Sequence, residues 1–406
     1  MLRKYLDKIK PNFMPGGKLQ AFHSVFDGFE TFLYTPKSTS KSGVHVHDAI
    51  DSKRVMIIVV LALIPCLLFG MYNAGYQNSI CSGVDMTFWQ MFAYGFLAIL
   101  PKIVVTYAVG LGIEFIVAQK RGEEIQEGFL VSGILIPLIC PVTTPLWMLA
   151  VATAFSVIFA KEVFGGTGFN IFNVALITRA FLFFAYPAQM SGDNAFIPTE
   201  PICGLGGKVV FADGVSGATP LGQVATGAQQ IVDAVGNPVS TWDAFLGLIP
   251  GSFGETSTLC ILIGAALLLL TGIASWRIIV SVFAGGLFMG LIANTFATDL
   301  YPASMLSPID QVVYGGFAFA AVFMATDPVT AARTGFGKYI YGFLVGVIAI
   351  IIRVYNNGYP EGAMLAVLLM NAFAPLIDYC VVQSNVNRRL RRLKNKASPT
   401  KQNNYE

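Results

Sequence analysis

Long apolar stretches that are nearly free of charged side chains constrain this chain more than any other feature of its sequence. Hydrophobic residues make up 55% of its 406 residues, the mean hydropathy is +0.64, and only 12% of the residues are charged. A soluble domain carries about 25% charged residues, so lipid must cover much of this surface. The composition therefore excludes an ordinary soluble enzyme, a disordered chain and a nucleic-acid-binding module.

The apolar stretches are spaced like the spans of a multi-pass membrane protein. A helix needs about 20 apolar residues to cross a hydrocarbon core of ~30 Å. Several stretches are shorter, which predicts tilt or partial membrane entry beside a buried site. We expect ten spans, at 55–72, 92–118, 129–140, 145–160, 172–187, 257–275, 277–297, 310–326, 339–353 and 362–382. The predicted fold class is an all-α integral membrane protein with some short or broken helices.

The placement of charge predicts the orientation of these spans. The net charge is only 26 − 23 = +3, but residues 1–54 hold nine Lys and Arg, residues 383–406 hold seven, and ten lie between them. The loop 188–240 carries four acids against one lysine. Basic residues mark the cytoplasmic side. The basic loop residues expected inside are Lys120, Arg121, Lys161, Arg277, Arg333 and Lys338. Both termini are therefore predicted to be cytoplasmic.

This topology divides the chain into five parts. The polar residues 1–54 lack the apolar core of a signal peptide and are predicted to form a cytoplasmic arm. Residues 55–187 and 257–382 form two transmembrane halves, joined by an extracytoplasmic loop at 188–256. Residues 383–406 form a basic cytoplasmic tail.

The two halves share a weak internal repeat. Gly128-Phe129, Pro141-Val142-Thr143, Lys161-Glu162-Val163-Phe164 and Ala180-Phe181 are matched in order by Gly315-Gly316, Pro328-Val329-Thr330, Arg353-Val354-Tyr355 and Ala372-Phe373. The offset drifts only from 187 to 192 residues. The first copy starts inside and the second outside, which predicts two inverted five-helix repeats, an arrangement found in many transport proteins. Chance similarity between two apolar stretches is the alternative.

The segment 213–219, Asp-Gly-Val-Ser-Gly-Ala-Thr, lies in the extracytoplasmic loop. Its glycines and small residues leave the Thr219 hydroxyl accessible on a flexible backbone. The three histidines, at positions 23, 45 and 47, all lie in the arm, which argues against a Ser/His/Asp hydrolase. From the residues alone, a solvated turn is the alternative to a functional site.

A second candidate is the glycine-rich segment 165–173 on the inner side. Its glycines allow a ligand to approach the backbone, and a helix start offers unpaired N–H donors. Asn170 and Asn173 are three residues apart, so they share a face if the helix has already begun. An ordinary helix N-cap is the alternative for Asn170.

Three acids in apolar surroundings form a third group of candidates. A charge at the bilayer centre costs at least ~2.5 kcal/mol, so such residues are functional candidates by default. Glu114 lies in the second span, Asp327 ends the eighth and Asp378 lies near the inner end of the tenth. Carboxylates and backbone carbonyls suit a cation that prefers oxygen ligands. Interfacial snorkelling or pairing with Lys or Arg is the alternative.

Two further features of the spans leave alternatives open. Gly110 and Gly112, beside Glu114, would let an aromatic ring or a neighbouring helix approach, and helix packing is the commoner reason for such residues. Arg179, inside the fifth span, could pair with Glu162 or meet a cofactor. The six cysteines contain no CxxC pair, so their spacing offers neither a zinc nor an iron–sulfur site.

Several longer motifs resemble one family over nearly the whole chain. They are Pro15-Gly16-Gly17-Lys18, Tyr34-Thr35-Pro36, Gly70-Met71-Tyr72-Asn73-Ala74-Gly75, Ala160-Lys161-Glu162-Val163-Phe164-Gly165-Gly166-Thr167-Gly168, Arg179-Ala180-Phe181-Leu182-Phe183-Phe184-Ala185-Tyr186-Pro187, Met324-Ala325-Thr326-Asp327-Pro328-Val329 and Tyr359-Pro360-Glu361-Gly362. The chain resembles the B subunits of sodium-translocating NADH:quinone reductases and, more distantly, the D subunits of the related Rnf complexes.

This resemblance implies cofactors at named positions. Covalent FMN is expected on Thr219, as a phosphoester made by a separate flavin transferase, with Ser216, Gly217 and Ala218 completing the attachment motif. Noncovalent riboflavin is expected at Asn170 and Asn173. Quinone is expected near Gly110, Leu111 and Glu114. The acids linked to sodium are expected to be Glu114, Asp327, Asp378 and Asp27 of the arm.

The resemblance also implies partners. The chain has no dinucleotide fingerprint and no GxxxxGK[ST] loop, so a partner subunit must oxidise NADH. The resemblance implies that this partner carries flavin and an iron–sulfur centre. A second FMN subunit and small membrane subunits are expected beside it in a bacterial inner membrane. The chain alone is expected to be inactive. The alternatives are an Rnf-type ferredoxin:NAD ion-pump subunit and a flavin-free channel for a small solute, since fold does not fix function.

Overall fold

The structure is a computed structural model. It describes residues 2–14, ten separate positions between 16 and 34, and the ranges 42–44, 52–122, 128–190, 196–209, 217–228, 230–233, 236–356, 358–359 and 361–397. Within these residues every regular element is helical, and the only β pairings are two isolated bridges in loops. The predicted all-α class is confirmed for this part of the chain.

Six helices are long and apolar enough to cross a membrane. They are α3 (Ser52–Ser82), α4 (Phe88–Arg121), α6 (Leu146–Ser156) with its continuation η3 (Val157–Lys161) and η4 (Glu162–Phe164), α12 (Trp276–Thr295), α15 (Gly337–Tyr355) and α16 (Ala363–Ala397). Each corresponds to one of the ten predicted spans. The chain is thus a multi-pass membrane protein by the length and composition of its helices.

The other four predicted spans are short or broken. Three are single short helices, α5 (Phe129–Ile139), α7 (Val174–Ala185) and α11 (Thr258–Leu270). The stretch 310–326 is not one helix: α13 (Pro308–Val313) ends before a turn at Gly315, and α14 (Phe317–Phe319) then leads into the π-helical η6 (Ala320–Met324). The arrangement of ten crossings in two repeats stays a prediction.

The end of α5 is stabilised by two buried cations. Pro141, which has no N–H to donate, follows the helix and prevents its continuation. The Lys102 ammonium donates to the carbonyl of Pro141 at 2.8 Å and to that of Val142, and Arg179 donates to the carbonyl of Ile139. Inside a membrane such carbonyls must find partners within the protein, and positive charge suits a helix C-terminus.

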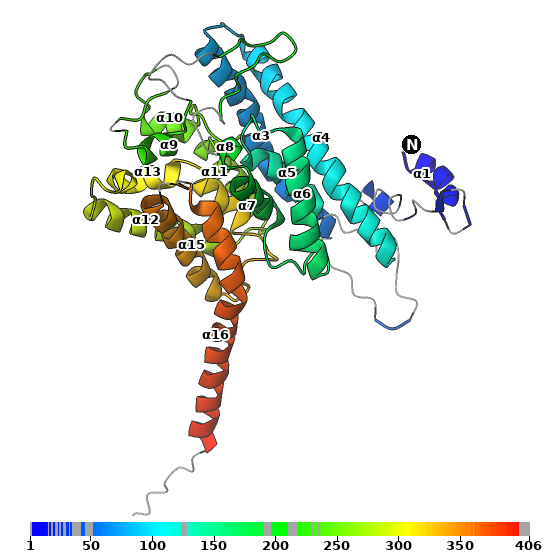
Figure 1. Cartoon of the computed structure of the whole chain (residues 1–406). Helices are drawn as coiled ribbons and strands as arrows, with labels where there is room; N and C mark the ends of the chain where they lie inside the picture. The colour runs from blue at the N-terminus through cyan, green and yellow to red at the C-terminus, as the bar shows by residue number, and fades with distance from the viewer. Residues whose placement is uncertain are drawn as a thin grey trace, which may run out of the picture.

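Glycines let the long helices pack closely. A side chain at Gly95 of α4 would overlap the backbone of Met71 on α3. On α15, a side chain at Gly346 would overlap the carbonyl of Val282 on α12. Small residues at helix contacts are the usual means of close approach in membranes. In Figure 1, α3 and α4 run side by side over most of their length.

The two halves share one buried core. It contains residues of α3, α5 and α7 from the first half and of α11, α12, α15 and α16 from the second. The short segment α14–η6 is almost entirely buried within it. Broken helices at membrane depth are tolerated where protein surrounds them, and this burial meets that condition.

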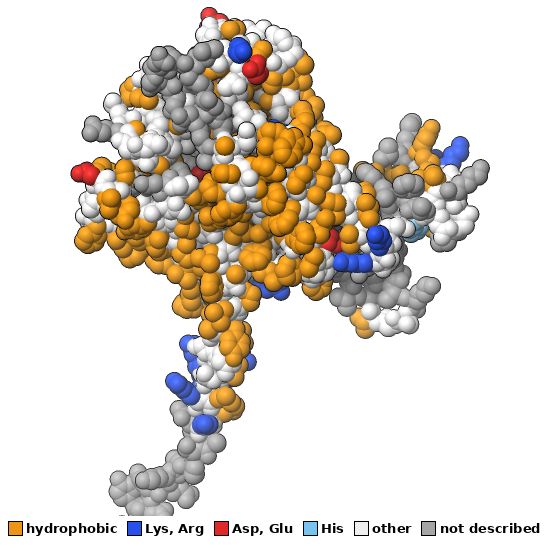
Figure 2. Space-filling model, viewed as in Figure 1, with side chains coloured by type: hydrophobic (Ala, Val, Ile, Leu, Met, Phe, Trp, Pro, Cys, Tyr) orange, Lys and Arg blue, Asp and Glu red, His pale blue; other side chains and the backbone are white. Residues whose placement is uncertain are grey.

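Polar loops and the termini lie outside this core. The short helices α8 (Pro187–Met190), α9 (Pro220–Ala225) and α10 (Thr241–Leu246) lie in the upper part of the body in Figure 1, and only Met190 of α8 and Val224 of α9 belong to this core. The N-terminal α1 (Leu2–Ile9) lies apart from the body. The far end of α16 projects below. Figure 2 shows a body covered mostly by hydrophobic side chains, with Lys and Arg along its lower side and on α16.

Candidate functional site

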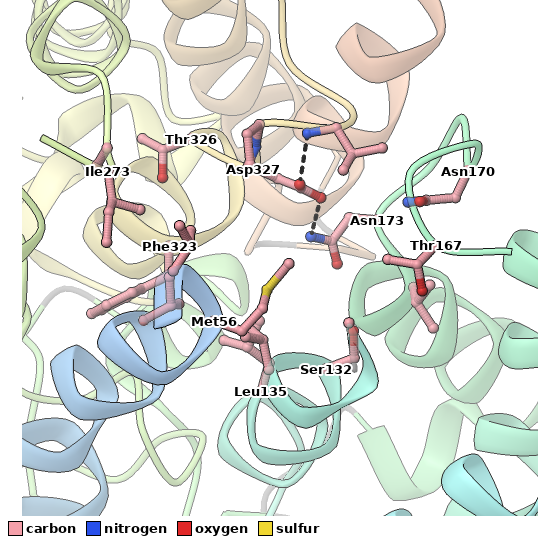
Figure 3. Close-up of a pocket in the computed structure, with 18 of the residues that line it drawn as sticks. Met56, Ser132, Leu135, Thr167, Asn170, Asn173, Ile273, Phe323, Thr326 and Asp327 are labelled. Atoms are coloured by element: carbon pink, nitrogen blue, oxygen red, sulfur yellow. Dashed lines mark hydrogen bonds between the residues drawn. The ribbon is translucent and has the colours of Figure 1, made fainter. Parts of the chain in front are cut away.

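The main candidate site is a cleft between the two halves. Its residues come from α3, the start of α5, the glycine-rich segment before α7, the end of α11 and the segment after η6, and it encloses about 840 Å³ including its open mouth. Figure 3 shows Phe323 and Ile273 on one side, Thr167 and Asn170 on the other, and Asp327 with Asn173 between them. The remaining described lining residues are Val55, Met56, Val59, Gly128, Val131, Ser132, Leu135, Lys161, Val174, Leu268, Ala274, Thr326, Pro328 and Val329.

Asn173 fixes the start of α7 and one wall of the cleft. Its Oδ1 accepts from the backbone N–H groups of Ala175 (3.0 Å) and Leu176 (3.3 Å), so it is the N-cap of the helix. Its Nδ2 donates to Oδ2 of Asp327 at 3.2 Å. One buried side chain therefore joins α7 to the loop after η6, across the two halves.

Asn170 lies in the turn before the helix rather than on it. Because α7 begins at Val174 with Asn173 as its N-cap, the condition for both asparagines to share a helix face is not met, and the alternative of an N-cap at Asn170 is wrong. The Asn170 amide donates to the carbonyl of Phe172 at 3.0 Å. Gly165, Gly166 and Gly168 all have positive φ, which explains why this turn is glycine-rich.

Asp327 is held by its own loop. Its carboxylate accepts from the N–H of Val329 (3.0 Å), from the hydroxyl of Thr330 (3.2 Å) and from Asn173. Its hydrogen bonds therefore come from three neutral donors, and it brings an acidic group to the cleft. The sodium-linked role expected for Asp327 stays a prediction.

Glu114 forms a buried ion pair with Lys161. Both side chains are 5% exposed, and the Lys161 ammonium contacts Oε1 of Glu114. Oε2 of Glu114 is buried without a hydrogen-bond partner among the described residues. Lys161 ends the π-helical η3 and also lines the cleft. Pairing with a lysine, the alternative named for such acids, is thus what the structure contains at Glu114.

The glycine beside Glu114 serves helix packing. A side chain at Gly110 would overlap the ring of Phe129 at the start of α5, whereas Gly112 faces open space. Leu111 packs against the core. The close approach that Gly110 permits is therefore made by an aromatic ring of the same chain.

Asp378 stabilises a turn before α15. It accepts from the N–H of Arg333 (2.7 Å), and from the N–H (2.9 Å) and hydroxyl (2.6 Å) of Thr334. Among the residues that the structure describes, no group of three or more His, Cys, Asp or Glu side chains is placed to hold a metal ion. Glu114, Asp327 and Asp378 therefore do not form one cluster, and Asp27 lies outside the described residues.

Thr219 lies in a second, smaller cavity. It is the N-cap of α9, and its Oγ1 accepts from the N–H of Gly222 at 3.2 Å. Gly217 and Ala218 are buried, Thr219 is half-buried, and Ser216 lies outside the described residues. The cavity beside Thr219 has a volume of about 350 Å³ including its open mouth, and it is also lined by Ser252, Glu255, Thr256 and Glu361.

Arg179 joins this second cavity to the core. Its guanidinium pairs with Glu255 at 3.0 Å and with Glu361. Glu162 instead pairs with Arg121 at 3.3 Å, so the first of the two alternatives named for Arg179, a pair with Glu162, is wrong. The true partners lie 76 and 182 residues away in sequence, and no local pattern could have indicated them. Sequence reasoning also missed Lys161 as a cleft residue, although its place in a predicted inner loop beside the glycine-rich segment was a signal.

Comparison with known proteins identifies the family. The model of the NQR2, RnfD, RnfE family matches residues 39–387. The B subunit of the Na(+)-translocating NADH-quinone reductase of Chromohalobacter salexigens is 46% identical over 412 residues, covering 96% of each chain. The corresponding protein of Azotobacter vinelandii is 43% identical, covering 97% of this chain and 99% of its own, and that of Klebsiella pneumoniae is 43% identical, covering 96% and 98%. The chain belongs to the NQR2, RnfD, RnfE family.

Proposed function

We propose that this chain is the B subunit of a sodium-translocating NADH:quinone reductase. In this role it passes electrons through FMN on Thr219 and riboflavin in the cleft to quinone, and couples their passage to sodium movement. The observation that carries the proposal is the similarity to relatives of that name over nearly the full length of both chains. We assign the noncovalent flavin to the cleft and the covalent flavin to the region of the smaller cavity beside Thr219.

The residues of the cleft fit a flavin. Apolar side chains such as Phe323 and Leu135 offer surfaces for a flat ring, and Asn170 adds a polar group at the edge. Oγ1 of Thr167 is buried with no partner within the described part of the chain, so a ligand hydroxyl or carbonyl could satisfy it. A bound flavin would supply the electron transfer, while these residues bind and orient it. Asn173 would act by holding Asp327 in place.

The surroundings of Thr219 fit a flavin phosphoester. Thr219 lines the small cavity, and its Oγ1 already accepts a hydrogen bond that an ester oxygen could also accept. Glu255 and Glu361 in the cavity share Arg179 as a partner, so one of their two negative charges is compensated. A flavin transferase acting outside the membrane would make the bond, with Ser216, Gly217 and Ala218 forming its recognition segment.

The proposed topology has ten membrane segments in two inverted repeats, with both termini cytoplasmic in a bacterial inner membrane. Two short segments support the inverted repeat. One is α5, which ends before Pro141, and the other is α14–η6, which ends before Pro328. Both are mostly buried, and they correspond to each other in the internal repeat. The arm 1–54 and the tail 383–406 then flank halves 55–187 and 257–382, with the loop 188–256 outside. The basic side chains on the lower side of the body in Figure 2 agree with this orientation.

Sodium and quinone are assigned to the inner side of the chain. Glu114, Asp327, Asp378 and Asp27 are the proposed acids linked to sodium, and Gly110, Leu111 and Glu114 the proposed quinone region. Oε2 of Glu114 is buried without a hydrogen-bond partner among the described residues, and this supports the inclusion of Glu114 among the sodium-linked acids. NADH is oxidised by a partner subunit with flavin and iron–sulfur groups, beside a second FMN subunit and small membrane subunits. An Rnf-type role stays the second candidate, because the matching family also includes RnfD.

Complementation tests this function. Membranes from a strain without the gene should lose sodium-stimulated reduction of quinone by NADH, and the wild-type gene should restore it. Thr219→Val should not restore it, whereas Thr226→Val, a change of the same kind at the other end of α9, should. Restoration of ferredoxin-dependent NAD reduction instead would favour the Rnf role. Equal restoration by both variants would contradict the place given to Thr219.

A further inference from the structure

Two charged side chains of opposite sign line the cleft, and they differ in how their charge is held. Among the described lining residues Lys161 is the only basic one and Asp327 the only acidic one. Asp327 accepts hydrogen bonds from neutral groups on its own loop and from Asn173. Lys161 instead is held by Glu114, which lies on α4. The position of the lysine charge therefore depends on a residue outside the cleft.

The Lys161–Glu114 pair is incompletely satisfied. An ammonium has three N–H donors, and the Lys161 ammonium contacts one oxygen of Glu114. The other carboxylate oxygen of Glu114 is buried and has no partner in the part of the chain that the structure describes. A buried charge needs a partner of opposite sign, so each member of the pair will follow any stronger partner that comes within reach.

The local backbone allows the lysine to serve two partners. Lys161 is the last residue of the π-helical η3, and π-helical turns are frequent at functional sites. The 3-10 turn η4 and the positive-φ glycines Gly165 and Gly166 follow it at once. Its long side chain therefore starts from a helix end between α4 and the cleft. The neighbouring acid, Glu162, is paired with Arg121 and does not compete for Lys161.

We propose that Lys161 is a shared counter-ion that couples charge in the cleft to cation binding at Glu114. Building on the proposed function, a flavin held in the cleft would gain one negative charge for each electron that it accepted. The Lys161 ammonium then moves toward that charge and leaves Glu114. One sodium ion binds the freed carboxylate, so the net charge of the buried region is unchanged. Lys161 acts here as a positioning residue.

The alternative is a static ion pair that only joins η3 to α4. The two mechanisms differ in whether the effects of changing Glu114 and Lys161 on the flavin midpoint potential add up. If charge acts through space alone, neutralising Glu114 shifts the midpoint potential of the cleft flavin equally whether or not Lys161 is present. If Glu114 acts by holding Lys161 away from the cleft, its effect disappears when the lysine is absent. Coupled sites must also influence each other reciprocally, so sodium must shift the flavin potential.

The test is a redox titration of the purified complex carrying Lys161→Gln, Lys161→Arg, Glu114→Gln or the double variant Lys161→Gln/Glu114→Gln. We expect Lys161→Gln to lower the midpoint potential of the noncovalent flavin and Glu114→Gln to raise it, each by a tenfold or larger change in the ratio of reduced to oxidised flavin. A tenfold change is about 59 mV for one electron. The double variant should match Lys161→Gln.

Sodium dependence provides a second readout. In the wild type and in Lys161→Arg the potential should rise with sodium concentration, and in Lys161→Gln and Glu114→Gln it should not. Additive shifts, or sodium dependence retained in Lys161→Gln, would overturn the inference. If the complex with Lys161→Gln does not assemble, the Glu114→Gln variant alone tests the inference. A midpoint potential of the noncovalent flavin that is unchanged or lowered in Glu114→Gln, or that still rises with sodium, would contradict the inference.

A control separates this inference from the proposed site. Asn173→Ser keeps an N-cap but removes the amide that holds Asp327, so it should release the noncovalent flavin. If it does and the Lys161 variants leave the potential unchanged, only the counter-ion role fails. If flavin content and potential are unchanged in every variant, the flavin is not in this cleft and both proposals fail.

Discussion

Asn173 makes two kinds of contact with one side-chain amide, and they can be separated by substitution. Asn173→Ala removes both the cap on α7 and the hydrogen bond to Asp327, whereas Asn173→Ser keeps a capping oxygen. We expect both variants to lose noncovalent flavin. Only Asn173→Ala should lose the contribution of the N-cap to the free energy of unfolding, which is about 1 kcal/mol. Flavin content after gel filtration and thermal unfolding measure the two effects, and full flavin retention in either variant would contradict the role of the amide.

Single residues were predictable where a local motif defined them. The motif at Thr219 and the glycine-rich turn before Asn173 are each contained within a few residues, and both line cavities. Glu114–Lys161 and Arg179–Glu255 were not predictable, because their partners lie 47 and 76 residues apart. Such pairs depend on how distant helices pack. Sequence spacing gives no information about that.

Among the elements, α4 offers a direct test of glycine packing. Gly95→Ala would force the helix away from the backbone of Met71, while Gly112→Ala on the same helix meets no neighbour among the described residues. We expect Gly95→Ala to destabilise the protein by about 1–3 kcal/mol. Gly112→Ala should be neutral or slightly stabilising, because alanine favours helices over glycine. Thermal unfolding followed with a dye that reacts with the buried Cys66 and Cys140 measures the difference. Equal midpoints for the two variants would contradict the packing argument.

Hydropathy predicted the long helices better than the broken ones. The six long spans were found because an apolar run of sufficient length has one main structural solution in lipid. The stretch 310–326 is equally apolar, but a turn at Gly315 breaks it, and the backbone there is tolerated because protein surrounds it. Burial among other helices is a tertiary property, so hydropathy alone could not distinguish this segment from a continuous span.

At the scale of the whole molecule, Arg179 links the two halves. It binds Glu255 and Glu361, and donates to the end of α5. Arg179→Met would leave Glu255, which is 4% exposed, without its cation, and we expect a loss of about 3–5 kcal/mol. Adding Glu255→Gln to Arg179→Met should recover part of the lost stability, because the uncompensated charge of Glu255 is then removed. Thermal unfolding of the assembled complex is the measurement.

An exposed arginine provides the control for that prediction. Arg333→Met removes a side chain on the surface, and it should leave the unfolding midpoint unchanged within experimental scatter. A midpoint for Arg179→Met equal to that of Arg333→Met would show that the buried network does not hold the halves together. A further loss of stability when Glu255→Gln is added to Arg179→Met would contradict the argument that an uncompensated charge on Glu255 causes the loss.

Covalent flavin on Thr219 is the property that most clearly separates an electron-carrying subunit from a flavin-free channel, and peptide mass spectrometry of the purified protein detects it. We predict that the peptide containing Thr219 carries the added mass of one FMN less one water, and that the addition disappears in Thr219→Val but persists in Thr226→Val. An unmodified wild-type peptide, or a flavin that remains covalently attached to this peptide in Thr219→Val, would contradict the proposed function.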